Sequence, residues 1–131
     1  MSQELYWLTL VTLLTGLLWV PYILQRFAND GLVATLLGNA NRTPDAPWAS
    51  RMVNAHSNAV ENLVIFAPLV LIVYITNSAT EITATAAMIY FFARVAHALM
   101  YMLNIPVLRT ISFLIGVGCQ LSIALTFLHL I

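Results

Sequence analysis

The sequence predicts an all-α integral membrane protein: a four-helix transmembrane bundle formed by a single domain over residues 1–131. Two observations carry this prediction. Hydrophobic residues make up 61% of the chain and charged residues only 8%, whereas soluble domains carry roughly 25% charged residues. Most of the chain also falls into four long apolar runs, each near the 20 residues that a helix needs to cross a bilayer. Lipid must therefore solvate most of the surface.

The four helices are expected at 4–27, 48–76, 81–103 and 106–130. The first run has no charged residue between Leu5 and Gln25, and Pro21 inside it predicts a kink. Short turns are expected at 77–79 and 104–106, and Pro106 is placed to begin the fourth helix. These bounds leave one long connection, the loop at 31–47.

The arginines predict the orientation of the bundle. Four spans put both termini and the turn at Asn77 at one end, and the 31–47 loop and the turn near Asn104 at the other. The second end carries the flanking arginines, which are Arg26, Arg42, Arg51 and Arg109. Because arginine-rich connections stay in the cytoplasm, the 31–47 loop and the turn near Asn104 are expected there. The sequon Asn41-Arg42-Thr43 would then lie away from the glycosylating side.

Composition also excludes several classes of function. The net charge is zero and lysine is absent, so no basic face is available for nucleic acid. The single cysteine, Cys119, excludes an internal disulfide and a multi-cysteine metal site. His56, His97 and Glu61 match no metal-ligand spacing, and nearby arginines would repel a cation, so no metal is predicted.

Polar residues interrupt the two middle runs at helical spacing. They are Arg51, Asn54, Asn58 and Glu61 on the second helix and Arg94, His97 and Tyr101 on the third. Separations of three and four residues place each set on one side of its helix. Ionisable groups inside a span are costly, which makes them functional candidates by default.

His56 points nearly opposite to Asn54, so the second helix carries polar residues on two faces. Lipid would satisfy neither face, and a single bundle has difficulty covering both. We therefore expect an oligomer in which the second helix contacts a neighbouring subunit.

The polar set has two interpretations. Each residue alone could have a structural role, forming hydrogen bonds that hold neighbouring helices together. Arg51 and Arg109 could extend to lipid phosphates. As a set, guanidinium groups bind carboxylates, asparagine and tyrosine add neutral hydrogen bonds, and Glu61 could accept an ammonium. This combination suits a small zwitterion with carboxylate and amide groups.

Three motifs resemble the MAPEG superfamily, the membrane-associated proteins in eicosanoid and glutathione metabolism. They are Arg51-Met-Val-Asn-Ala-His56-Ser-Asn58-Ala-Val-Glu61-Asn62, Ala93-Arg94-Val-Ala-His97-Ala-Leu-Met-Tyr101 and Pro106-Val-Leu-Arg109-Thr-Ile-Ser112-Phe113. The third is similar to the start of the fourth helix in microsomal glutathione transferases. The resemblance covers essentially the whole chain and suggests a bacterial-type member.

The resemblance implies a homotrimer in a bacterial inner membrane that binds glutathione between subunits. It implies a transferase or peroxidase acting on lipophilic electrophiles or hydroperoxides, with Arg109 as the catalytic residue that stabilises the thiolate. Glu61 would hold the α-ammonium, and His56 and His97 would serve structural hydrogen bonding. The implied glutathione-binding residues are Arg51, Asn54, Asn58, Glu61, Arg94 and Tyr101.

The chain also departs from the family pattern. Val53 and Asn54 stand where glutathione-using members carry basic residues, and the region near Pro21 lacks the arginine of the eicosanoid enzymes. An alternative therefore stays open: a non-enzymatic MAPEG-like membrane protein whose polar cluster is structural or binds another anionic ligand.

Overall fold

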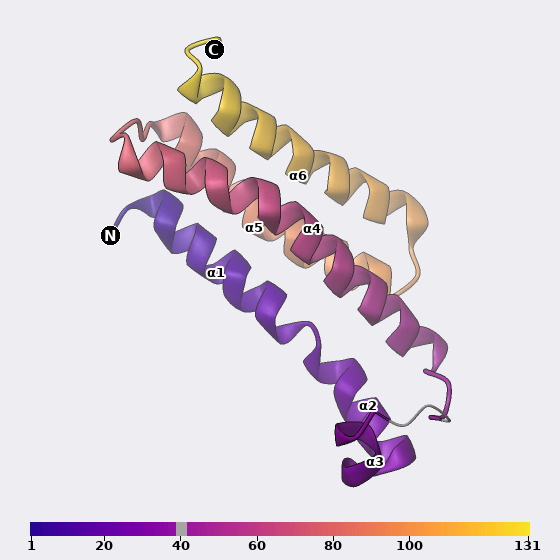
Figure 1. Ribbon diagram of the computed structural model, residues 1–131. Helices are drawn as coiled ribbons and strands as arrows, with labels where there is room; N and C mark the ends of the chain where they lie inside the picture. The colour runs from indigo at the N-terminus through magenta and orange to yellow at the C-terminus, as the bar shows by residue number, and fades with distance from the viewer. Residues whose placement is uncertain (39–41) are drawn as a thin grey trace.

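The protein is a bundle of antiparallel helices, seen here in a computed structural model that describes residues 1–38 and 42–131 (Figure 1). Asn41 of the sequon lies outside the described residues. The helices are α1 (Gln3–Leu17), α2 (Val20–Asp30), α3 (Leu32–Leu36), α4 (Pro47–Ile75), α5 (Glu81–Met102) and α6 (Pro106–Phe127). No strand occurs in the described part of the chain. The predicted all-α, four-helix class is confirmed.

The first span consists of two helices rather than the continuous helix expected at 4–27. The helix is interrupted at Leu18 and Trp19, and Pro21 lies in the first turn of α2. Proline has no backbone N–H to continue the helical bonding, so the break occurs where the sequence predicts a kink. α2 continues to Asp30 and ends at Gly31, whose φ of 84° suits glycine.

Both tight turns contain an asparagine with left-handed backbone geometry. Asn77, after α4, has a φ of 53°, and Asn104, after α5, has a φ of 59°. In each turn the next backbone N–H donates to the carbonyl five residues earlier at 2.9 Å, which closes the helix end. Pro106 then begins α6, as predicted. These turns make α4, α5 and α6 successively antiparallel.

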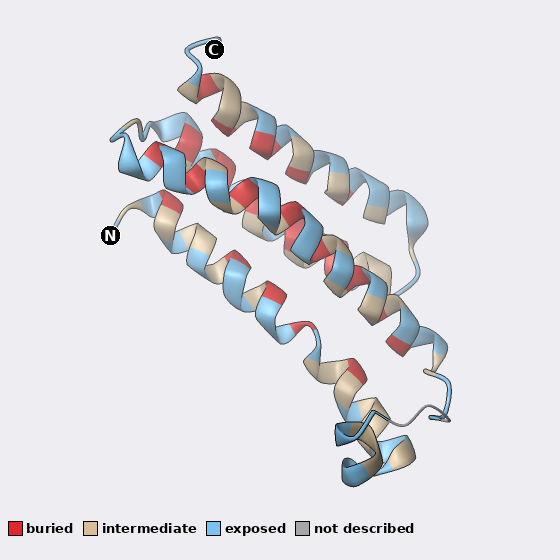
Figure 2. Cartoon of the chain, in the orientation of Figure 1, coloured by how far each residue is buried: buried red, intermediate tan, exposed pale blue. Residues whose placement is uncertain are grey.

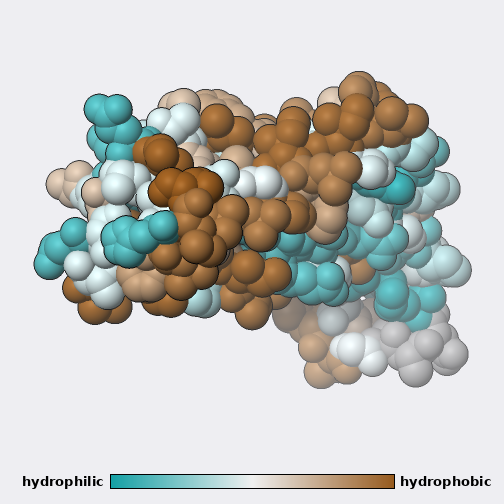
Figure 3. Space-filling view, turned by 90° about the horizontal axis from the view of Figure 1, so that it is seen from above, coloured by the Kyte–Doolittle hydropathy of each residue, from teal (hydrophilic) through white to brown (hydrophobic). Residues whose placement is uncertain are grey.

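The outer surface of the bundle is apolar. Four segments are long and apolar enough to cross a membrane: Gln3–Asp30, Pro47–Ile75, Glu81–Met102 and Pro106–Phe127. Large side chains on all of them, such as Leu13, Val64, Phe92 and Leu114, are more than half exposed. Figure 2 shows buried residues along the facing sides of the helices, and Figure 3 shows hydrophobic residues over much of one face. The protein is therefore an integral, multi-pass membrane protein.

α4 and α5 each contact all the other spans, and the contact between α5 and α6 is the most extensive. Both termini and the α4–α5 turn lie at one end of the bundle, as predicted, and the α5–α6 turn and α3 lie at the other (Figure 1). The N-terminal half of α4, the C-terminal half of α5 and the first turn of α6 therefore meet at the second end. This arrangement brings the predicted polar residues together.

Candidate functional site

Arg94 lies at the centre of a polar network between α4 and α5. Arg94 is buried, with only 3% of its surface exposed. Its Nη2 donates to Oδ1 of Asn58 at 2.7 Å and lies 3.3 Å from Nδ1 of His97. Its Nε is buried without a hydrogen-bond partner among the described residues. A buried, unpaired donor of this kind is where a water or a ligand oxygen would bind.

Amide groups extend this network across the bundle to α6. Nδ2 of Asn62 donates to the backbone oxygen of Asn58 at 2.9 Å, and Nε2 of Gln120 donates to the backbone oxygen of Asn62 at 3.2 Å. Nε2 of Gln120 also lies 3.5 Å from the hydroxyl of Tyr90, whose ring stacks on Phe66 with centroids 3.8 Å apart. Sequence reasoning missed Gln120, although an amide in an otherwise apolar run was an available signal.

A cavity of about 240 Å³ opens beside this network. Its walls come from α4, α5 and α6: Asn58, His97, Tyr101, Arg109, Thr110 and Phe113. The guanidinium carbon of Arg109 lies 4.5 Å from the centre of the Tyr101 ring, a cation–π contact. Arg109 also belongs to the first turn of α6, where the helix dipole favours negative charge. The cavity therefore combines a cation, an amide and aromatic walls.

The remaining predicted residues lie outside this cavity. Nε of Arg51 donates to the backbone oxygen of Met102 at 3.1 Å and so bonds to the C-terminal end of α5. Asn54 and Glu61 are exposed, and neither forms a hydrogen bond or ion pair within the described part of the chain. Glu61 is the middle residue of the 29-residue helix α4. A charged side chain facing lipid at such a depth costs about 2.5–3.5 kcal/mol or more.

His56 finds its partner within its own chain. Its Nδ1 lies 2.8 Å from the hydroxyl of Tyr22, a buried residue of α2. This second polar face of α4 therefore has a hydrogen-bond partner in α2 and does not by itself require a neighbouring subunit. The case for an oligomer now rests on the Asn54 and Glu61 face alone.

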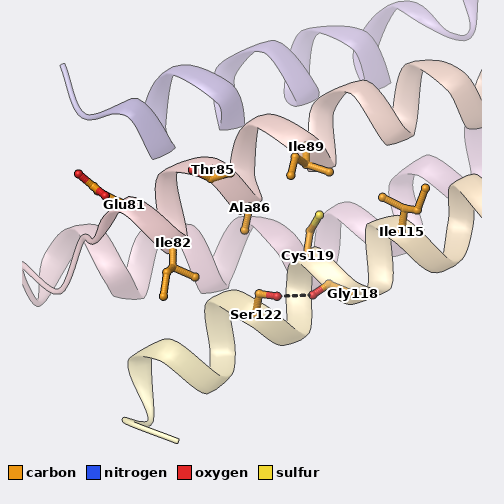
Figure 4. A pocket seen from close by; sticks show the side chains of 9 residues that line it. All are labelled: Glu81, Ile82, Thr85, Ala86, Ile89, Ile115, Gly118, Cys119 and Ser122. Atoms are coloured by element: carbon orange, nitrogen blue, oxygen red, sulfur yellow. Dashed lines mark hydrogen bonds between the residues drawn. The ribbon is translucent and has the colours of Figure 1, made fainter. Parts of the chain in front are cut away.

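A larger cavity, of about 550 Å³, lies between α5 and α6 nearer the end that holds the termini. Ala86 and Cys119 are its buried lining residues, and Ile82, Ile89 and Ile115 flank it (Figure 4). At 100° per residue, Ile115, Gly118 and Ser122 lie about 120–180° around α6 from Arg109, and Cys119 lies about 80° from it. This mostly apolar cavity is therefore separate from the polar site.

A family model described as the MAPEG family matches residues 5–129. The chain belongs to the MAPEG family. Among curated proteins no match is found. The MAPEG family includes glutathione transferases and peroxidases as well as non-enzymatic members, so membership accounts for the membrane bundle without deciding the activity. For this MAPEG protein the described residues include no group of three His, Cys, Asp or Glu side chains that could hold a metal ion.

Proposed function

We propose that this MAPEG protein is a membrane-bound, glutathione-dependent transferase or peroxidase acting on lipophilic electrophiles or hydroperoxides. The observation that carries the proposal is the convergence of Arg109, Tyr101 and Asn58 on one open cavity. A guanidinium at the start of a helix favours an anion. A neighbouring cation also lowers the pKa of a thiol, and the thiolate is the nucleophilic form. Arg109 is the proposed catalytic residue, since it would stabilise the glutathione thiolate.

Glutathione supplies the nucleophilic sulfur for two reactions. In transfer, the thiolate attacks an electrophilic carbon, a C–S bond forms, and the leaving group departs with its electron pair. In reduction, the sulfur attacks a hydroperoxide oxygen, the O–O bond breaks, and the departing alkoxide takes a proton to become an alcohol. A second glutathione then condenses with the resulting sulfenic acid to give a disulfide and water. The lipophilic substrate would arrive from the surrounding lipid.

We further propose that a homotrimer completes the site. The cavity of about 240 Å³ is smaller than the 300–1,000 Å³ of usual small-molecule sites. Asn54 and Glu61 are uncovered and need a polar neighbour. A second copy that placed its Asn54 and Glu61 against the cavity would both enlarge the site and cover these two side chains. Glu61 would accept the α-ammonium and Arg51 would lie near the carboxylates. Arg94 would act by orienting Asn58.

The oligomer proposal is tested by Glu61→Leu, with Tyr74→Leu as the control at an exposed position on another side of α4. If α4 faces a neighbour through Glu61, Glu61→Leu weakens the trimer measured by light scattering in detergent, and Tyr74→Leu does not. A monomeric wild-type protein, or an assembly indifferent to Glu61→Leu, would contradict the proposal.

The activity is tested by Arg109→Met, with Arg42→Met in the 31–47 loop as the matched loss of one guanidinium. We expect Arg109→Met to lower the rate of glutathione turnover with a lipophilic electrophile by a factor of about 10² or more, as the loss of one electrostatic stabiliser typically does. Arg42→Met should retain turnover. Equal activity in both variants would contradict the role of Arg109, and an inactive wild-type protein would contradict the function.

The non-enzymatic alternative is favoured by one observation: Arg94, Asn58, Asn62 and Gln120 hydrogen-bond to one another. A network of this kind is typical of polar side chains that hold transmembrane helices together by hydrogen bonds. The double substitution of Arg94 and Arg109 separates the two functions. An enzyme would lose thiol turnover while its assembly persists, whereas a structural cluster would lose the assembly itself.

We also propose that the protein lies in a bacterial inner membrane with the 31–47 loop and the turn near Asn104 in the cytoplasm. The supporting observation is the position of Arg26, Arg42, Arg51 and Arg109 toward that end. Membrane-impermeant thiol labelling in intact cells should reach Ala79→Cys and not Pro44→Cys. The reverse pattern would mean the opposite orientation.

A further inference from the structure

α3 presents an apolar face that no other described segment covers. Leu32, Val33, Leu36 and Leu37 are between 59% and 80% exposed. Their positions, i, i+1, i+4 and i+5, put them on one side of a helix. Three of these side chains belong to α3 and Leu37 caps its C-terminal end. Four large apolar side chains gathered in this way are unlike single hydrophobic residues scattered over a surface, and such a patch indicates a binding partner.

The other side of α3 is attached to the end of α2. The hydroxyl of Thr35 lies 3.4 Å from the backbone oxygen of Arg26 and 2.8 Å from that of Gly31. Gly31, with its φ of 84°, is the single residue between the two helices. This short, bonded connection keeps α3 next to the end of the first span (Figure 1). The apolar face is therefore held outward from α2.

A charged cluster lies close to α3 where the chain returns toward α4. Asp45 accepts from Nη2 of Arg26 at 3.1 Å and from Nη1 of Arg42 at 2.8 Å. Asp30 accepts from the backbone N–H and the hydroxyl of Thr43 at 3.0 and 2.7 Å. The first apolar span ends at Asp30, so this cluster lies where the apolar surface of that span ends.

We propose that α3 is seated in the phospholipid leaflet at this end of the bundle. The four apolar side chains lie among the outermost acyl segments, and the Arg26, Arg42 and Asp45 cluster lies among the headgroups. Only Gly31 separates α3 from the span, so its apolar face continues the lipid-facing surface of the bundle. An apolar face bordered by charged groups is the arrangement of helices that lie in a membrane interface. α3 thereby fixes the depth at which the first span ends.

The proposal is tested with the full-length protein in phosphatidylcholine vesicles, using Cys119→Ala as the cysteine-free parent. An environment-sensitive fluorophore is attached at Leu36→Cys, and at Pro44→Cys as an exposed control in the same loop. Quenching is measured with lipids that carry a nitroxide either near the headgroup or near the chain end. Leu37→Cys carries the same test if Leu36→Cys does not fold.

The expected result at Leu36→Cys is a blue-shifted emission that headgroup-proximal nitroxides quench at least about two-fold more than chain-end nitroxides, as burial in the interface requires. Pro44→Cys, which lies in the charged cluster, should keep the red-shifted emission of a water-exposed fluorophore and should be quenched less by the headgroup-proximal nitroxides than Leu36→Cys. A blue shift without lipid quenching would mean that protein covers α3. Emission like that of Pro44→Cys would mean that water does, and either result would overturn the proposal.

Discussion

The side chain of Arg94 donates to the side-chain oxygen of Asn58 at 2.7 Å, which joins α5 to α4 beside the polar cavity. Asn58 lines that cavity, whereas Arg94 is 3% exposed. The buried cation therefore orients an amide that faces the cavity. Of the predicted binding residues, Asn58 and Tyr101 line the cavity and Arg94 lies behind Asn58, whereas Arg51, Asn54 and Glu61 lie outside the cavity.

A double-mutant cycle measures how strongly this pair is coupled. Asn58→Ala and Arg94→Ala should each lower the free energy of unfolding in detergent by about 1.5–3 kcal/mol, since each removes a hydrogen bond to a charged group. The coupling energy between them should be about 0.5–3 kcal/mol, the range for residues in contact. Additive effects would show that the bond contributes nothing specific.

Tyr22→Phe tests the contact that covers the second polar face of α4. The substitution keeps the ring and removes only the hydroxyl, which lies 2.8 Å from Nδ1 of His56. Unfolding followed by circular dichroism should show a loss of about 0.5–1.5 kcal/mol, the net contribution of one hydrogen bond. Tyr74→Phe is the control, because the hydroxyl of exposed Tyr74 has no hydrogen bond within the described residues. A Tyr22→Phe variant as stable as that control would contradict the account.

Two glycines of α6 should differ in how well they tolerate a larger side chain. A Cβ atom added at Gly116 would lie 3.6 Å from the Tyr90 ring and 3.9 Å from Cδ of Arg94, whereas one at Gly118 meets nothing within 4 Å. Gly116→Leu should therefore be less stable than Gly118→Leu by about 1–3 kcal/mol, the usual cost of overpacking. Thermal unfolding of the two variants makes the comparison. Equal stability would show that the Tyr90 and Arg94 layer can yield.

Acid should release the loop that leads into α4. The hydrogen bond from Arg26 is the main reason that the pKa of Asp45 lies below its ordinary 3.8, and Arg42 adds to it. A carboxyl with a lowered pKa stabilises the fold above its unfolded pKa, and this contribution disappears as the pH falls through the folded pKa. The anisotropy of a fluorophore at Pro44→Cys should therefore fall below pH 3.8.

Asp45→Asn is the control for this loop, since it cannot change charge. Its anisotropy should be low throughout and should show no step with pH. A step of the same size in Asp45→Asn would assign the transition to another group.

The sequence predicted the fold because hydrophobic run lengths, Pro21, Asn77 and Asn104 act locally. The sequence also predicted that one end of the bundle would hold Asn58, Arg94, Tyr101 and Arg109. Short turns make consecutive helices antiparallel, and this places the polar parts of α4, α5 and α6 at the same end. The sequence could not predict which of these side chains would be buried. Arg94 bonds inward and Glu61 faces outward because burial depends on how whole helices pack, and helical spacing alone does not fix that.

Two pairings depended on contacts between segments far apart in the chain. His56, in α4, meets Tyr22, which lies in α2 beyond the break in the first span. At the other end Glu4, a residue near the N-terminus that is 3% exposed, accepts from the hydroxyl of Thr83 at 2.5 Å. Neither partner lies within a helical turn of the other, so spacing gave no signal for them.

The most direct test of the central claim is a calorimetric titration of the purified protein with glutathione, with S-methylglutathione as the comparison. If Arg109 binds the thiolate, glutathione should show saturable binding and release a proton, so that its heat depends on the ionisation enthalpy of the buffer. S-methylglutathione, which has no thiol proton, should release none. The absence of saturable glutathione binding up to millimolar concentrations, or binding without proton release, would contradict the account.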